Sequence, residues 1–251
     1  MFNKEIIILC FIAHLLGDFY FQSNKMALLK NDLGNIKTHK KNYLALLLHA
    51  FLYAIPFSFL FAFTKATTCI IIIASIFVSH LIIDLLRVLI DKKIDKIPPI
   101  ITFIFDQAFH ICVILLLLLI KTEIFSDNYE WLVINFTPFK YAACILFLLK
   151  PSSIIVSLML DSTNIKLDEN KQTNPKGKMD VGAIIGYLER LMVLFLGILN
   201  AWTAIAIVIT AKTWARQNDI RADDSFKHQY LIGTFTSLVL AISMGLLFIN
   251  I

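Results

Sequence analysis

The chain has 251 residues, of which 58% are hydrophobic, and its mean hydropathy is +0.76. Apolar runs of membrane-spanning length recur along it, which excludes a soluble globular domain. Its net charge of +5 comes from lysines that gather in short loops, where basic residues set membrane topology, so the charge does not predict a nucleic-acid partner.

The apolar runs predict an all-α fold, a polytopic transmembrane helical bundle of seven or eight spans. The first run, residues 6–21, contains His14 and Asp18 and lacks a small-residue cleavage site. It is therefore predicted to be the first span and not a cleavable signal peptide. The predicted helices cover about residues 5–23, 43–64, 68–90, 98–121, 138–160, 181–200, 202–211 and 230–248.

Basic residues lie in the loops after the first, third, fifth and seventh predicted spans, which places these loops in the cytoplasm and both termini outside. This topology requires a break near residues 200–202. One unbroken helix over residues 181–216 would put Lys212 and Arg216 on the outside. Trp131 is expected to anchor its segment at the outer interface.

Histidine and aspartate recur four residues apart inside three of the apolar runs, and another histidine lies in a fourth run. These residues are His14 with Asp18, His80 with Asp84, Asp106 with His110, and His49. Four-residue spacing puts both members of a pair on one face of a helix. Counted from the predicted cytoplasmic ends, all seven lie at a depth of about 9–18 Å. We therefore expect one shared site in a four-helix half, residues 1–121, with a second four-helix half, residues 122–251, packed on it in a single membrane domain.

Three aspartates in apolar helices need a partner. Each costs roughly 2.5–3.5 kcal/mol at the centre of a membrane helix, so Asp18, Asp84 and Asp106 are expected to face one another, a cavity or a cation. Imidazole and carboxylate are ligands of Zn²⁺, Mn²⁺ and Fe²⁺. The seven donors exceed the needs of one tetrahedral zinc, which predicts two ions, or one ion with a separate base. A proton relay and polar contacts between helices are the alternatives.

The second half has a polar set at the same predicted depth, namely Lys150, Glu189 and Arg190. One interpretation is a buried ion pair between Glu189 and Lys150, with Arg190 turned elsewhere. The other is that Lys150 and Arg190 bind an anionic group, such as a lipid phosphate, beside the metal. Arg87 and Lys212 are predicted to lie nearer the surface, where long side chains snorkel.

Several of these segments together resemble a family of bacterial integral membrane proteins that carries only a domain-of-unknown-function label. They are residues 14–19 with Gln22, 49–50, 80–84 and 106–107 with His110, and in the second half residues 186–190, 211–212 and 230–234. More distantly, the HxxxD pattern is similar to that of the YdjM-like membrane-bound metal-dependent hydrolases and of zinc phospholipase C and P1-nuclease-like enzymes. The soluble enzymes start from an N-terminal tryptophan ligand, which this chain lacks.

Three hypotheses of function follow. The first is a membrane-embedded metal-dependent hydrolase of a lipid or polyprenyl phosphoester, with a divalent metal as cofactor, zinc first and manganese or iron as alternatives. Asp106 would act as base, and Lys150 and Arg190, with Glu189 beside them, would steady the phosphate. The second is a divalent metal or proton transporter that uses the same cluster, and the third is a non-catalytic subunit whose polar core sets helix packing. The expected partner is membrane lipid, with an anionic lipid as substrate, and the expected location is a bacterial inner membrane.

Overall fold

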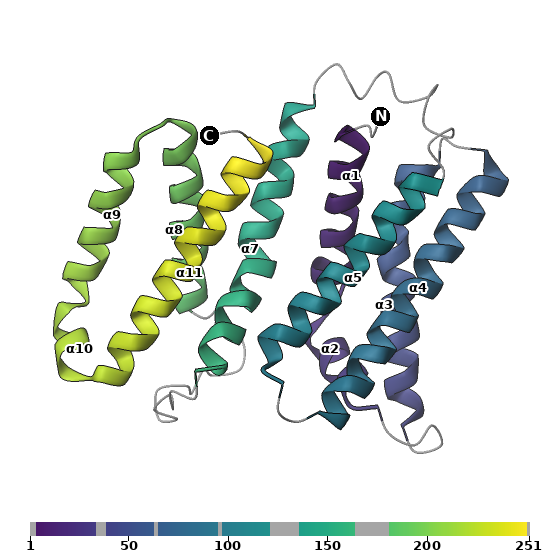
Figure 1. Cartoon of the computed structure of the whole chain (residues 1–251), viewed down its shortest axis with the longest axis horizontal. Coiled ribbons are helices and arrows are strands. Elements are labelled where there is room, and N and C mark those ends of the chain that lie inside the picture. Colours follow the sequence, from purple (N-terminus) through teal and green to yellow (C-terminus); the bar gives the residue numbers. More distant parts are fainter. Residues whose placement is uncertain are drawn as a thin grey trace. The chain divides into compact units, whose positions relative to one another are not determined.

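The computed structural model describes residues 4–33, 39–62, 65–94, 97–120, 136–163 and 181–249 (Figure 1). All regular elements in these ranges are helices, which confirms the predicted all-α class. The chain divides into two compact units, Met1–Ala143 and Cys144–Ile251. Trp131 and its predicted interfacial segment lie outside the described residues.

The first unit is built around helix α3, Lys40–Phe61, which contacts α1, η1, α2 and α4. Along the chain its elements are α1 (Lys4–Leu15), the π-helical turn η1 (Leu16–Tyr20), α2 (Asn24–Asn31), α3, α4 (Ala66–Lys93) and α5 (Pro99–Ile120). Helix α5 packs on α4 and on α1. The long helices coincide with the apolar runs of the sequence, because a helix needs about 20 apolar residues to cross the hydrocarbon core of a membrane.

Within the described ranges, the candidate spans are fewer than the predicted seven or eight. Five described helices are long and apolar enough to cross a membrane, namely α3, α4, α5, α7 (Thr137–Asp161) and α11 (Asp224–Phe248). The pair formed by Lys4–Tyr20 and Asn24–Asn31 is bent by 82° and adds at most a sixth span. Helix α9, Trp202–Ala215, has only 14 residues, which is short of the length that crosses a bilayer as a straight helix.

Apolar side chains cover the outer face of the long helices. On α4 the exposed ones include Ile71, Val78, Ile82 and Leu86, each about half exposed. A water-soluble protein rarely exposes apolar surface on this scale, whereas a bilayer accommodates it. The long apolar helices therefore indicate a membrane-embedded protein.

Helix α2 is an element that the sequence did not predict, because its eight residues were assigned to a basic loop. Ser23 caps it, since the Ser23 hydroxyl accepts a hydrogen bond from the Met26 backbone N–H at 3.2 Å. Just before the bend, η1 approaches α3 closely at Gly17. A Cβ atom there would lie 2.8 Å from Tyr53 Cα, so only glycine permits this packing.

Buried residues on α4 and α5 form stripes in which polar side chains lie between apolar ones. On α4 the buried residues are Ile72, Ile76, His80, Asp84 and Val88, each four positions after the last. On α5 the corresponding stripe is Phe103, Asp106, His110, Ile114 and Leu118. An apolar core that includes Phe57 and Ile76 lies on one side of this polar level, and a smaller cluster of Leu33, Leu46 and Val88 lies on the other. The polar groups therefore lie between two apolar clusters.

The second unit contains most of α7, together with α8 (Val181–Ile198), α9, α10 (Gln217–Ala222) and α11. The predicted break in residues 181–216 is confirmed, because α8 ends at Ile198 and α9 begins at Trp202. Asn200 has φ of +55°, a left-handed conformation in which asparagine is one of the few tolerated residues after glycine. Helix α8 contacts both α9 and α11.

Candidate metal centre

Six of the predicted ligands lie together in the first unit, and we call them the polar layer. They are Asp18 on η1, His49 on α3, His80 and Asp84 on α4, and Asp106 and His110 on α5. Asp18 is 9% exposed and the other five are at most 4% exposed. The four helical segments therefore bring these six side chains together, and their role as metal ligands stays a prediction.

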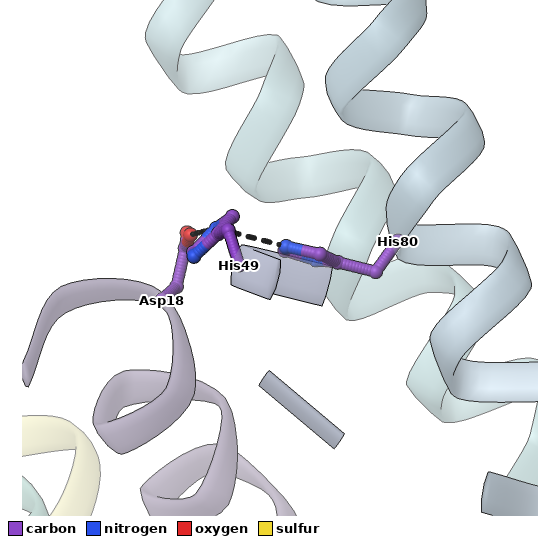
Figure 2. A group of neighbouring side chains, drawn as sticks. All are labelled: Asp18, His49 and His80. Atoms are coloured by element: carbon purple, nitrogen blue, oxygen red, sulfur yellow. Dashed lines mark hydrogen bonds and ion pairs between the residues drawn. The ribbon is translucent and has the colours of Figure 1, made fainter. Parts of the chain in front are cut away.

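Four ligand atoms of the polar layer lie close together, and we call them the quartet. They are Asp18 Oδ1, His49 Nε2, His80 Nε2 and Asp84 Oδ2. His49 Nε2 lies 3.2 Å from Asp18 Oδ1, 3.1 Å from His80 Nε2 and 3.5 Å from Asp84 Oδ2. His80 Nε2 and Asp84 Oδ2 are 3.6 Å apart. Figure 2 shows Asp18 and His80 approaching His49 from opposite sides. Ligand bonds of about 2.0–2.1 Å to a tetrahedral zinc would place neighbouring ligand atoms about 3.4 Å apart, so these four separations are of the size that a shared ion requires. Asp18, His49 and His80 each offer an atom within 4.8 Å of the other two, and Asp84 lies beside both histidines.

Hydrogen bonding alone satisfies the quartet poorly. A ring nitrogen offers either one N–H or one lone pair in the plane of the imidazole. His49 Nε2 is within hydrogen-bond distance of both Asp18 Oδ1 and His80 Nε2. If His49 Nε2 carries the hydrogen, two acceptors share it; if His80 Nε2 donates to His49 instead, Asp18 Oδ1 receives no hydrogen from His49. A cation among these atoms would instead receive a lone pair from each of them, which is the arrangement that the donor set favours.

A second group of convergent atoms involves His110 and Asp106. Three buried atoms here have no hydrogen-bond partner among the described residues: Nδ1 and Nε2 of His110, and Oδ1 of Asp106. Ligand atoms of Asp18, Asp106 and His110 lie within 4.8 Å of one another, as do those of His80, Asp84 and His110. Buried polar atoms without partners are costly, so this group offers a place for a second ion or for a polar ligand.

A chain of hydrogen bonds orients the two aspartates that face these groups. Gln107 Nε2 donates to Asp18 Oδ2 at 2.8 Å and to Asp106 Oδ2 at 3.1 Å. Gln107 Oε1 must then accept from His14 Nε2, 3.0 Å away, so that His14 Nδ1 accepts from the Tyr53 hydroxyl at 3.0 Å. The chain leaves Asp18 Oδ1 and Asp106 Oδ1 turned toward the ligand groups.

His14, which the sequence predicted to be a metal ligand, orients other residues in the structure instead. Both of its ring nitrogens are engaged, by Tyr53 and by Gln107, and it belongs to none of the three possible ligand groups of the described residues. It orients the ligands through Gln107. Tyr53, which the sequence analysis did not single out, also stacks on His80 with ring centroids 3.6 Å apart and planes 11° apart.

Two basic residues of the described part of the chain enter the polar layer, and the sequence predicted neither of them there. Lys30 Nζ of α2 lies 2.9 Å from Asp84 Oδ2, with both side chains at most 5% exposed. Arg87 Nη1 donates to Asp106 Oδ2 at 3.1 Å, so Arg87 does more than reach toward the surface. Arg87 follows Asp84 by three residues on α4, a spacing that puts both on one side of a helix and that could have revealed it. The contact of Lys30 joins elements 54 residues apart, so no local pattern predicts it.

The formal charges of the layer nearly balance. Among the residues that the structure describes, three carboxylates face two basic side chains, which leaves one negative charge when the histidines are neutral. One divalent cation would turn this balance to one positive charge. Two cations would leave a larger excess, which an anionic ligand would offset.

The predicted polar residues of the second unit have contacts of their own. Glu189 forms its ion pair with Lys212 of α9 at 2.6 Å, where the sequence had suggested Lys150, and Lys212 also donates to Thr234. Arg190 is buried, with Nε donating to the Leu148 carbonyl at 2.7 Å. Its Nη2 and Nη1 donate to the hydroxyls of Ser153 at 2.6 Å and Ser237 at 3.4 Å. Lys150 lies on α7, half-buried.

The chain matches a model of a protein family. A family model described as "Protein of unknown function (DUF3307)" covers residues 6–139, just over half of the 251 residues. These residues include the whole polar layer together with Lys30, Arg87 and Gln107. No curated protein and no solved structure matches the chain. The likeness to YdjM-like hydrolases has no support among these comparisons and stays a prediction.

Proposed function

The chain belongs to the DUF3307 family, whose function is unknown, and we propose that its first unit is a divalent-metal centre that hydrolyses a phosphoester of a membrane lipid or polyprenyl carrier. The single observation that carries the proposal is the quartet. In this buried site, His49 Nε2 lies 3.1–3.5 Å from the other three atoms, and His80 Nε2 lies 3.6 Å from Asp84 Oδ2. Groups of this kind and spacing fit zinc first, and manganese or iron as alternatives.

The residues present suit a hydrolytic reaction. A divalent cation bound by Asp18, His49, His80 and Asp84 would supply Lewis-acid activation of water and phosphate. Asp106 is the base: its Oδ1 has no partner among the described residues and accepts the proton of the attacking water, while Arg87 and Gln107 hold its Oδ2. The oxygen of this water bonds to phosphorus, the bond from phosphorus to the ester oxygen breaks, and the leaving oxygen takes up the proton that Asp106 accepted, so that the alcohol leaves and Asp106 is a carboxylate again.

The phosphate needs positive charge near the reacting bond. Lys30 and Arg87 are the basic residues that contact the polar layer, so we assign them the role that the sequence suggested for Lys150 and Arg190. Arg190 has three of its nitrogens engaged by acceptors of its own unit, which fits a structural role better. A site held by long apolar helices favours a substrate that resides in the membrane, and the basic loops of the sequence favour a bacterial inner membrane.

Two measurements on purified protein in detergent test the proposal. Metal analysis should find about one divalent ion or more per chain, and release of phosphate from a lipid phosphomonoester should stop when a chelator removes the ion. Asp106→Asn should abolish release while the quartet still binds an ion. Asp161→Asn, on an exposed carboxylate at the end of α7, is the matched control and should behave as wild type. Wild-type protein without stoichiometric metal would end the proposal.

One observation favours a second candidate, a transporter of a divalent metal. The 82° bend between Lys4–Tyr20 and Asn24–Asn31 follows Asp18 directly, and transporters commonly place an ion site beside a broken helix. The same protein in liposomes loaded with a metal-sensitive dye separates the two functions. Metal flux without phosphate release favours transport, and phosphate release without flux favours the hydrolase.

A further inference from the structure

Lys30 occupies an unusual position for a residue of a short polar helix. It is 4% exposed and is the one buried residue of α2. Its ammonium meets Asp84 Oδ2 at 2.9 Å inside the first unit. A lysine placed in such surroundings loses its hydration and the freedom of a long side chain, so the ion pair has to compensate for both.

The partner of Lys30 is also a ligand atom of the quartet. Asp84 Oδ2 lies 3.5 Å from His49 Nε2 and 3.6 Å from His80 Nε2, so an ion held by these three atoms would sit close to the ammonium. Two cations at such a separation repel strongly where water is excluded. The oxygen therefore cannot serve a divalent ion and the lysine equally well.

From this geometry we infer that Lys30 and the metal ion compete for Asp84, so that loading of the centre displaces the Lys30 ammonium. The inference rests on the metal centre proposed above and adds a specificity-determining residue to it. Only an ion that binds Asp84 more strongly than the tethered ammonium enters the quartet. Divalent cations satisfy this condition better than Na⁺ or K⁺ because their attraction to the carboxylate is twice as large at equal distance.

The competition extends to helix α2. Two polar contacts fasten its C-terminal end: the Lys30–Asp84 ion pair, and the hydrogen bonds from the Asn42 side chain to Asp32 just past the helix. An ion that takes Asp84 removes the first of these contacts. Because Lys30 and the ion compete for one oxygen, whatever weakens the docking of Lys30 must strengthen the binding of the ion.

The sign of one mutational effect separates this inference from an ordinary supporting role. Removing a residue that orients a metal ligand weakens metal binding, typically 10–100-fold. Removing a competitor strengthens it. In Lys30→Gln, a neutral amide still donates to Asp84, so the side chain keeps a hydrogen bond but loses its charge.

The experiment measures the dissociation constant of Zn²⁺ for the full-length chain in detergent, in competition with a chelating dye. We expect Lys30→Gln to bind Zn²⁺ about tenfold or more tightly than wild type. Lys30→Arg, which retains the charge, should bind no more tightly than wild type. Lys25→Gln removes the same charge from an exposed position on the same helix and should leave the constant unchanged.

A second readout covers loss of stability in the variants. Zn²⁺ should raise the unfolding temperature of Lys30→Gln by more than it raises that of wild type, because tighter binding adds more stability at equal ion concentration. Equal or weaker Zn²⁺ binding by Lys30→Gln, with wild-type binding intact, would overturn the inference and leave the metal centre standing. Absence of Zn²⁺ binding in all variants would overturn both.

Discussion

Both units bury charged residues among apolar helices, but they satisfy them differently. In the second unit, three nitrogens of the Arg190 guanidinium each meet a carbonyl or hydroxyl acceptor, and Glu189 pairs with Lys212. In the first unit, acceptors crowd together: carboxylates and imidazoles approach within 3.1–3.6 Å, and several buried atoms have no partner among the described residues.

This difference shows that residue type and membrane depth alone do not distinguish structural polar residues from functional ones. A buried polar group that is fully paired stabilises packing, whereas convergent groups that are only partly paired predict an additional cation or ligand. The first unit is therefore the candidate functional centre, and the second unit supplies an internal control for each test of it.

The largest expected effect comes from His80→Ala, which removes one ligand of the quartet and the ring that stacks on Tyr53. Metal affinity should fall on the order of 100-fold or more, since losing a ligand costs at least as much as losing an orienting partner. The measurement is metal content and Zn²⁺ affinity of the purified chain. His228→Ala changes an exposed histidine of α11 and should retain wild-type affinity. Equal metal content in the two variants would contradict the proposal that the metal centre lies in the first unit.

A second contrast concerns backbone packing, and Gly17→Ala tests it. The added Cβ would lie 2.8 Å from Tyr53 Cα and 2.9 Å from the Tyr53 carbonyl oxygen, so η1 must move away from α3. We expect a loss of about 1–3 kcal/mol in unfolding free energy. Weaker metal binding should accompany it, because Asp18 is the next residue. Gly233→Ala in the second unit has its nearest contact at 3.9 Å, so thermal unfolding should show no loss of stability.

Arg190→Leu tests whether the buried arginine of the second unit has a structural role. It removes charged hydrogen bonds to the Leu148 carbonyl, Ser153 and Ser237, and leaves these acceptors without their donor. The unfolding free energy should fall by about 2 kcal/mol, while Zn²⁺ affinity stays at the wild-type value. Thermal unfolding and dye competition on one preparation measure both. A variant that folds normally but loses metal or substrate binding would restore Arg190 to the functional site.

Much of the fold was predictable because membrane-spanning helices consist of long apolar runs, which can be recognised in the sequence. The four-residue stripes of α4 and α5 were likewise visible as HxxxD and DxxxH spacings. The short elements were not: α2 has eight residues and little apolar character, and α9 is shorter than a normal span. Counting each apolar run as a span therefore gave too many.

The ligand set was predictable only as far as residue type and depth allow. His14 has the same spacing to Asp18 as His80 has to Asp84, yet its nitrogens meet Tyr53 and Gln107. Lys30 reaches Asp84 across 54 residues, a tertiary contact with no local signature. Which member of a polar set binds a metal and which member orients it depends on such contacts, so sequence spacing could not separate these roles.

The smallest expected effect tests the orienting chain itself. Tyr53→Phe removes the hydroxyl that donates to His14 Nδ1 but keeps the ring that stacks on His80. His14 can then turn, and Gln107 loses the partner that holds it against Asp18 and Asp106. We expect a loss of about 0.6–1.5 kcal/mol in stability and a Zn²⁺ affinity weakened by up to about tenfold. Tyr230→Phe in the second unit removes an exposed hydrogen bond to Thr213 and should leave Zn²⁺ affinity unchanged. If both variants bind Zn²⁺ as wild type does, the hydroxyl contributes to packing alone, and the chain through His14 does not tune the centre.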